Sequence, residues 1–153
     1  MSGSDQQASA RASVQASTDG DGWASNGKRL LVKLSGEAFC KPGVGGIDPV
    51  ELALIAGEIA AARSHGAEIA VVVGGGNFIR GGELAKRGDI GRATADYMGM
   101  LGTIINAMAL KDKLESMGTP ARGCAALEIR QVAEPFIRGR AIRHLEKGRV
   151  VEL

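Results

Sequence analysis

The sequence predicts an α/β fold in which parallel strands alternate with helices. Two short apolar runs, residues 29–34 and 68–73, are rich in aliphatic side chains, uninterrupted and bounded by glycine, which is typical of buried strands. A helix-like segment connects them, so we expect a right-handed βαβ unit. The chain is 44% hydrophobic but only 3% aromatic, and a core of small aliphatic side chains suits closely packed strands and helices.

Both predicted strands end in small-residue loops of the kind that holds phosphate. The first opens into Ser35 and Gly36, and the second opens into residues 74–77, Gly-Gly-Gly-Asn. Adjacent parallel strands place such loops side by side at their carboxyl ends, where open α/β sheets bind ligands. We therefore expect one ligand-binding crevice there, although a glycine cluster can also form only a tight turn.

The N-terminal residues 1–27 are predicted to be a disordered extension, and residues 28–153 to form one domain. The extension is rich in Ser, Ala, Gln, Gly and Asp and holds almost no large apolar side chain except Trp23. A chain of 153 residues can bury about two-thirds of its unfolded surface, which is enough for a core.

The first helix is predicted to start after Asp48, a carboxylate N-cap, with Pro49 at the first helical position. Its apolar stripe is expected to consist of Val50, Leu54, Ile55, Ile59 and Ala62. Gly66 is a plausible left-handed stop before the second strand. The loop over residues 40–46 is expected to be mobile from its composition, and the polar residues 80–92 are expected to form a short helix plus a turn.

The second half of the chain continues the same alternation. The longest helical pattern covers residues 93–117 and ends at Gly118. Its predicted apolar face consists of Met98, Leu101, Ile105, Met108 and Leu114. A third strand over residues 121–126, a helix over residues 135–147 and a fourth strand over residues 149–153 follow. Because the chain stops within that strand, the domain is expected to be incomplete.

Composition and charge argue against several classes of function. The net charge of +2 leaves no broad cationic face, so nucleic acid is not an expected partner. The late basic residues Arg138, Arg140, Arg143, Lys147 and Arg149 are interpreted as a solvated helix face. Cys40 and Cys124 lack metal-ligand spacing and are expected to be reduced thiols of a cytoplasmic protein. His65 and His144 are expected at the surface, and no segment predicts a signal peptide or a membrane span.

Several motifs together resemble the amino acid kinase family. They are Lys-Leu-Ser-Gly-Glu at residues 33–37, Gly-Gly-Gly-Asn at residues 74–77, and Arg-Gly at residues 80–81. Two further segments, residues 94–101 and 142–151, resemble the bacterial uridylate (UMP) kinase branch of that family. The triple glycine alone would be weak evidence for this family, but the combination of motifs, in order and at sensible spacing, is strong evidence.

The resemblance implies roles for particular residues. Lys33 would neutralise the phosphoryl group in transfer and Arg80 would bind phosphate, both as catalytic residues. ATP contacts would come from Lys33, Leu34, Ser35, Gly36, Gly76 and Arg80, and UMP contacts from Gly75 and from Asp96, which would bind the ribose hydroxyls. An allosteric GTP loop would consist of Lys41, Pro42, Gly43, Val44, Gly45 and Gly46. Mg²⁺ would bind through the nucleotide phosphates, without a protein metal site.

Plainer explanations of these residues stay open. On spacing alone, Lys33 can simply reach solvent and Arg80 can be an ordinary surface arginine. Asp96 can serve the dipole of its helix, and the loop over residues 41–46 can be an ordinary flexible surface loop.

The resemblance also implies an activity and a fold. A UMP kinase of this family is a three-layer α/β/α sandwich with a mainly parallel sheet, and it transfers the γ-phosphoryl group of ATP to UMP in pyrimidine nucleotide biosynthesis. The resemblance to this branch also implies a homohexamer that is activated by GTP and inhibited by UTP. The helix over residues 93–117 could pack against a partner subunit.

One departure shapes the expected activity. In the family the last strand continues into a Thr-Gly-Asn-Pro-Phe-Phe-Thr-Thr-Asp loop and a C-terminal half that holds the adenosine of ATP, neither of which this sequence contains. Residues 28–153 are therefore expected to be the UMP-binding part, and a catalytically inactive remnant that only binds nucleotide or associates with subunits is the main alternative. A relative acting on an amino acid or carbamate is a third alternative, against which residues 94–101 argue.

Overall fold

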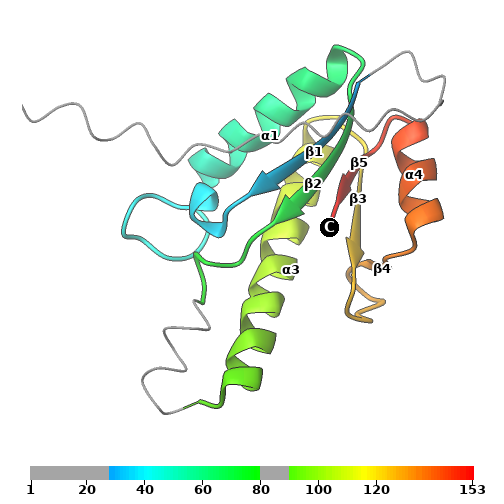
Figure 1. The fold of residues 1–153 in the computed structure, drawn as a ribbon. Helices are drawn as coiled ribbons and strands as arrows, with labels where there is room; N and C mark the ends of the chain where they lie inside the picture. Colours follow the sequence, from blue (N-terminus) through cyan, green and yellow to red (C-terminus); the bar gives the residue numbers. More distant parts are fainter. Residues whose placement is uncertain (1–27, 80–89) are drawn as a thin grey trace, which may run out of the picture.

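The computed structural model describes residues 28–79 and 90–153 (Figure 1). Its elements are β1 (Arg29–Leu34), the 3₁₀ helix η1 (Gly36–Phe39), α1 (Pro49–Ser64), β2 (Glu68–Val73), α3 (Arg92–Ser116), β3 (Ala121–Ala125), β4 (Glu134–Pro135), α4 (Arg138–Glu146) and β5 (Val150–Glu152). The predicted extension over residues 1–27 lies outside the described residues, as does most of the predicted helix and turn over residues 80–92. Within the described ranges, no helix is both long and apolar enough to cross a bilayer.

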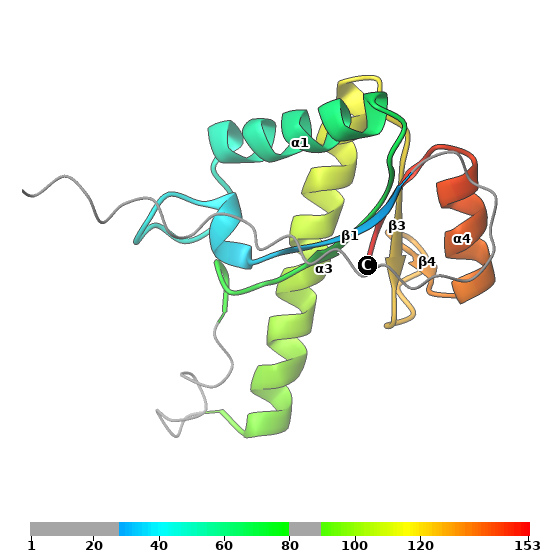
Figure 2. The same ribbon diagram turned by 45° about the horizontal axis from the view of Figure 1, so that its top comes forward.

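The strands form one parallel sheet in the order β1-β2-β5-β3-β4. Helices α1 and α3 cover one face and α4 covers the other, so that Figure 2 shows the sheet between two helical layers. This arrangement confirms the predicted three-layer α/β/α sandwich. The parallel β1–β2 pairing runs in register from Arg29 opposite Glu68 to Leu34 opposite Val73, as expected for the first βαβ unit.

Two apolar clusters hold the layers together. The larger one joins the sheet to α1 and α3, and its buried members are Leu34, Phe39, Ala56, Ile59, Ile69, Val71, Val73, Leu110, Leu114, Ala121 and Val150. The smaller one joins the sheet to α4, and its buried members are Ala70, Cys124, Ala141, Leu145 and Val151. Alternate residues of β2 and β5 therefore serve opposite clusters, as the pleat of a strand requires.

The start and end of α1 follow the local signals in the sequence. The carboxylate of Asp48 accepts hydrogen bonds from the backbone N–H groups of Val50, at 2.9 Å, and Glu51, at 3.2 Å. Lys41, which bonds the same carboxylate, and these N–H groups lower the pKa of Asp48. Gly66 adopts a left-handed φ of 87° just after the helix, which glycine does without strain.

The predicted apolar faces of both long helices were partly wrong. On α1, Val50 and Leu54 are 60% and 59% exposed, whereas Ile59 is buried as predicted and Ala56, which was not predicted, is buried beside it. On α3, the expected core residues Leu101, Ile105 and Met108 are exposed, whereas Ala95, Gly102, Asn106, Leu110 and Leu114 are buried. The physical reason is that the N-terminal half of α3 packs against backbone, which selects small or hydrogen-bonding residues.

The predicted helix over residues 135–147 starts later than expected, at Arg138. The residues before it form β4, in which Glu134 lies opposite Cys124 and Pro135 lies opposite Ala125 of β3. The N–H of Phe136 extends this pairing by donating to the Ala125 carbonyl at 2.9 Å. A two-residue strand is too short to show any periodicity, so the sequence could not reveal it.

Candidate phosphate-binding site

The small-residue loops after β1 and β2 lie against each other, as the sequence predicted. The N–H of Gly74 donates to the carbonyl of Leu34 at 2.8 Å, which extends the strand pairing into the loops. A Cβ built on Gly74 would lie 2.9 Å from the backbone nitrogen of Gly36. A Cβ on Gly36 would meet the backbone nitrogen of Gly76 and lie 2.6 Å from Oδ1 of Asn77. Both glycines are therefore required for the close approach of the two loops.

The second loop also packs directly on the backbone of α3. A Cβ on Gly75 would lie 2.6 Å from the carbonyl oxygen of Gly99 and 2.7 Å from the nitrogen of Thr103. Across the same contact, a Cβ on Gly102 would lie 3.2 Å from the oxygen of Gly75. By contrast, Gly76 is exposed, and among the described residues its Cβ would meet no atom within 4 Å.

Lys33 and Leu34 point to opposite faces of the sheet at the end of β1. Leu34 is buried in the cluster beneath α1 and α3, so its side chain cannot face a ligand. Lys33 is exposed and, by strand alternation, lies on the other face, opposite Val72 in register. Lys33 and the loop at Gly75 thus approach the same carboxyl edge of the sheet from its two faces.

Asp96 lies in the N-terminal part of α3. It precedes Gly99, against which Gly75 packs, by one turn or about 5 Å along the helix axis. Asp96 is not in the first turn, which contains no acidic residue, so the alternative that Asp96 serves the helix dipole loses its basis. Its carboxylate instead accepts from Nε of Arg92 at 2.9 and 3.0 Å, an i,i+4 ion pair on the helix surface. Asp96 keeps a side chain that is 53% exposed.

The loop over residues 41–46 returns to the glycine loop at Gly46. The N–H of Gly46 donates to the carbonyl of Asn77 at 3.0 Å, and Nδ2 of Asn77 donates to the carbonyl of Gly46 at 2.7 Å. At its other end, Lys41 pairs with Asp48 at 3.1 Å. The remaining predicted site residue, Arg80, lies outside the described residues.

Sequence reasoning missed Asn106, which stands in the middle of α3. Its side chain is fully buried and forms a reciprocal amide pair with Asn77, with N–O distances of 2.7 and 3.0 Å. Nδ2 of Asn106 also donates to the carbonyl of Gly74 at 2.8 Å. The only available signal was a polar residue in an otherwise apolar helical stretch, flanked by residues that were assigned to the wrong face.

A cavity of about 150 Å³ lies between α3 and the carboxyl ends of β3 and β5. It is lined mainly by apolar side chains, with Lys111 as the charged residue among its walls. Cys124 also lines it, and burial, followed by the nearby Glu134, raises the pKa of this thiol. No group of three or more metal-ligating side chains occurs in the parts of the chain that the structure describes.

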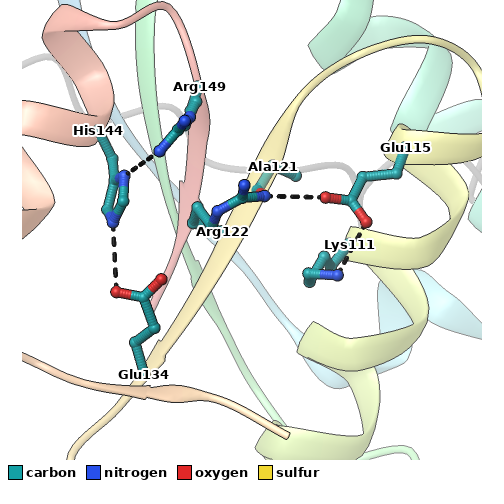
Figure 3. A network of polar contacts seen from close by, with 7 residues as sticks. All are labelled: Lys111, Glu115, Ala121, Arg122, Glu134, His144 and Arg149. Atoms are coloured by element: carbon teal, nitrogen blue, oxygen red, sulfur yellow. Dashed lines mark hydrogen bonds and ion pairs between the residues drawn. The ribbon is translucent and has the colours of Figure 1, made fainter.

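Two polar networks flank β3 (Figure 3). In the first, Glu115 bonds Lys111 at 2.8 Å and Arg122 at 3.0 Å, and these cations, Lys111 above all, lower the pKa of Glu115. Both cations lie at the surface, with side chains about one-third exposed.

The second network corrects the expectation that His144 is a surface residue, because its side chain is only 12% exposed. Arg149 lies 2.9 Å from Nδ1 of His144, and Glu134 lies 3.3 Å from Nε2. Because a guanidinium can only donate, Nδ1 accepts from Arg149 and Nε2–H donates to Glu134. The imidazole therefore ties β4 to the end of α4.

A parallel sheet between two helical layers, with small-residue loops at the ends of neighbouring strands, defines the class of open α/β proteins that bind ligands at the carboxyl edge of the sheet. Within that class, the model of the amino acid kinase family matches residues 28–152, and the chain belongs to that family. The family predicted from the motifs is thereby confirmed.

The curated relatives include two uridylate kinases. The chain is 58% identical over 123 residues to that of Streptomyces avermitilis, a match covering 80% of this chain and 48% of the relative. It is 55% identical over 124 residues to that of Rubrobacter xylanophilus, covering 81% and 49%. The chain thus spans about half the length of the curated relatives it matches.

The fold is also similar to solved structures. The UMP kinase from Bacillus anthracis superimposes with a TM-score of 0.77 at 40% identity, covering 82% of this chain and 51% of that one. The UMP kinase from Ureaplasma parvum also gives a TM-score of 0.77, at 27% identity, covering 84% and 54%. These likenesses agree with the sequence resemblance to the UMP kinase branch.

Proposed function

We propose that this chain provides the UMP-binding part of a UMP kinase, which transfers the γ-phosphoryl group of ATP to UMP and yields UDP for pyrimidine nucleotide synthesis. The observation that carries the proposal is the junction of the two small-residue loops at the carboxyl ends of β1 and β2. The similarity of the chain to two uridylate kinases, at 58% and 55% identity, supports UMP as the acceptor.

Phosphoryl transfer needs the donor and acceptor phosphates held in line, with cations and N–H donors on the transferring oxygens. We assign the cationic role to Lys33 and Arg80 and the N–H role to the backbone at Gly76 and at Ser35–Gly36. Gly75 would contact UMP, and the exposed carboxylate of Asp96 would accept hydrogen bonds from the ribose hydroxyls. Mg²⁺ binds with most of its waters and the substrate phosphates, so the absence of an acidic cluster among the described residues is compatible with it.

The proposal includes self-association through α3, with a homohexamer as the assembly. Tyr97, Leu101 and Ile105 follow each other at four-residue intervals and are 58%, 46% and 46% exposed. Residues at this spacing lie on one face of a helix, and the described part of the chain does not cover that face. We assign GTP activation to the loop over residues 41–46, because Gly46 bonds directly to the glycine loop, and we include UTP as an inhibitor.

A nucleotide-binding protein without turnover is the second candidate function. The observation that favours it is that the chain spans about half the length of the matched uridylate kinases. Both candidates predict UMP binding, and they differ only in catalysis.

The test is a coupled ADP-release assay with ATP, Mg²⁺ and UMP, together with calorimetric titration of the chain with UMP. Turnover that depends on UMP supports the kinase, and binding without turnover supports the second candidate. Failure to bind UMP while the chain remains folded overturns both.

Asp96→Ala is expected to weaken UMP binding at least tenfold and to leave ATP binding within twofold, because only UMP would use this carboxylate. Arg92→Ala is the matched control: it removes the ion pair with Asp96 and keeps the carboxylate. Calorimetry on both variants measures the difference. Equal losses for UMP and ATP, or equal effects of the two substitutions, would contradict the ribose role.

A further inference from the structure

The amide pair Asn77–Asn106 joins three segments that are distant in the sequence. Asn106 belongs to α3, Asn77 follows the glycine loop, and Nδ2 of Asn77 reaches the carbonyl of Gly46 at 2.7 Å. Asn106 is fully buried and Asn77 is 7% exposed. Two primary amides in such a place must satisfy their hydrogen bonds within the protein, since a buried donor left without a partner lowers stability.

Every amide hydrogen of the pair has a partner. Nδ2 of Asn106 donates to Oδ1 of Asn77 at 2.7 Å and to the carbonyl of Gly74 at 2.8 Å. Nδ2 of Asn77 donates to Oδ1 of Asn106 at 3.0 Å and to the carbonyl of Gly46 at 2.7 Å. Rotating either amide by 180° would put its oxygen against a carbonyl oxygen, so the network admits one arrangement.

The pair acts on groups that lie at the proposed phosphate site. Asn106 binds the first residue of the glycine loop, and Asn77 is the residue after its last glycine. Asn77 holds Gly46 through two hydrogen bonds, one from its side chain and one to its backbone carbonyl. A displacement of the chain at Gly46 must therefore move Asn77 or break both bonds.

We propose that Asn106 is a positioning residue which, through Asn77, fixes the glycine loop on α3 and couples to it the position of the loop over residues 41–46. The inference rests on the proposed function for its consequence, UMP binding, but the coupling itself is a property of the fold. The geometry of the phosphate-binding backbone is then set from the middle of α3 and not only by strands β1 and β2.

The test compares Asn106→Asp with Leu110→Ala. The first substitution keeps the shape of the side chain and removes both donated hydrogen bonds. The second creates a cavity one turn further along the same helix, at a fully buried residue of the core cluster, and serves as the control for lost stability alone. Asn77→Asp, which keeps Oδ1 and loses the donor to Gly46, is the second variant should Asn106→Asp not fold.

Two measurements are made on the full chain below the melting temperature of the least stable variant. Calorimetric titration with UMP is expected to show at least a tenfold loss of affinity for Asn106→Asp and a change within twofold for Leu110→Ala. Hydrogen exchange without ligand is expected to show at least tenfold faster exchange of the Gly46 amide in Asn106→Asp. The amide of Gly118, which bonds Glu115 at the far end of α3, is the reference.

These outcomes separate the inference from the proposed function. If the unmodified chain does not bind UMP, the proposed function fails, and the exchange of the Gly46 amide still decides the coupling. If UMP affinity and the exchange of the Gly46 amide change in proportion to the loss of stability in both Asn106→Asp and Leu110→Ala, Asn106 has only a structural role and the inference is overturned.

Discussion

A buried carboxyl group in the central strand is expected to make the stability of this protein fall as the pH rises. Glu152 in β5 lies between β2 and β3 and is 0% exposed, and neither of its carboxyl oxygens has a hydrogen-bond partner within residues 28–79 and 90–153. Burial raises the pKa of Glu152 from 4.5 to about 8. The charged groups that face it are Lys111 and Glu115 from α3 and Arg122 from β3, and the Cys124 thiol of β3 lies near enough to feel its charge.

The size and sign of the effect follow from the two pKa values. Between pH 4.5 and about pH 8 the folded chain keeps a proton on Glu152 that the unfolded chain has lost, so the free energy of unfolding decreases through this window. Below pH 4.5 both states are protonated and the effect vanishes. At about 1.4 kcal/mol for each pKa unit, the full cost above pH 8 is about 5 kcal/mol, a large share of the stability of a typical domain.

The perturbation is Glu152→Gln, which has the same shape and cannot ionise. Urea unfolding followed by circular dichroism at pH 5 and pH 8 gives the free energy of unfolding for both proteins. The unmodified chain is expected to lose about 3–4 kcal/mol more than the variant between these two pH values. Glu152→Leu is expected to raise stability at pH 7 by about 3 kcal/mol, because it also removes the unpaired polar atoms. An identical pH dependence of the unmodified chain and Glu152→Gln would refute the reasoning.

Two further predictions test the loop contacts and the start of α1. Gly75→Ala is expected to lower stability by about 2 kcal/mol or more and to abolish UMP binding, because its Cβ would lie 2.6 Å from the carbonyl oxygen of Gly99. Thermal melting measures the stability and calorimetry the binding. Gly76→Ala, whose Cβ would meet no described atom within 4 Å, is the control for the loss of stability. Asp48→Ala is expected to lower the urea midpoint, whereas Asp48→Asn keeps the cap and most of the stability; equal midpoints for all three proteins would show that the cap contributes nothing.

The sequence predicted those parts of the fold that depend on local signals. The βαβ unit follows from two apolar runs and from the Asp48–Pro49 helix start, and the proximity of the small-residue loops follows from parallel pairing. The orientation of α3 could not be predicted by hydrophobicity, since the helix meets the glycine loop through Gly102 and Asn106 and leaves Leu101 and Ile105 exposed.

The missed parts of the site depend on contacts between distant segments. Asn106 has its partner 29 residues away, and the pairing of His144 with Glu134 depends on a two-residue strand that no pattern reveals. Such contacts exist only after the layers have packed. The roles assigned to Lys33, Gly76 and Asp96 remain proposals for the experiments above.

The strand order also governs how this domain can assemble during synthesis. Strand β5, which is made last among the described elements, separates β2 from β3, so the β1–β2 and β3–β4 pairs share no hydrogen bonds until Val150–Glu152 enters between them. Before β5 is synthesised, β2 and β3 each have an inner edge without a partner strand among the described elements, and such edges are sites for wrong pairing. The joining of these two pairs depends on three residues that carry a carboxyl group into the core, and contacts between segments so distant in the sequence form slowly.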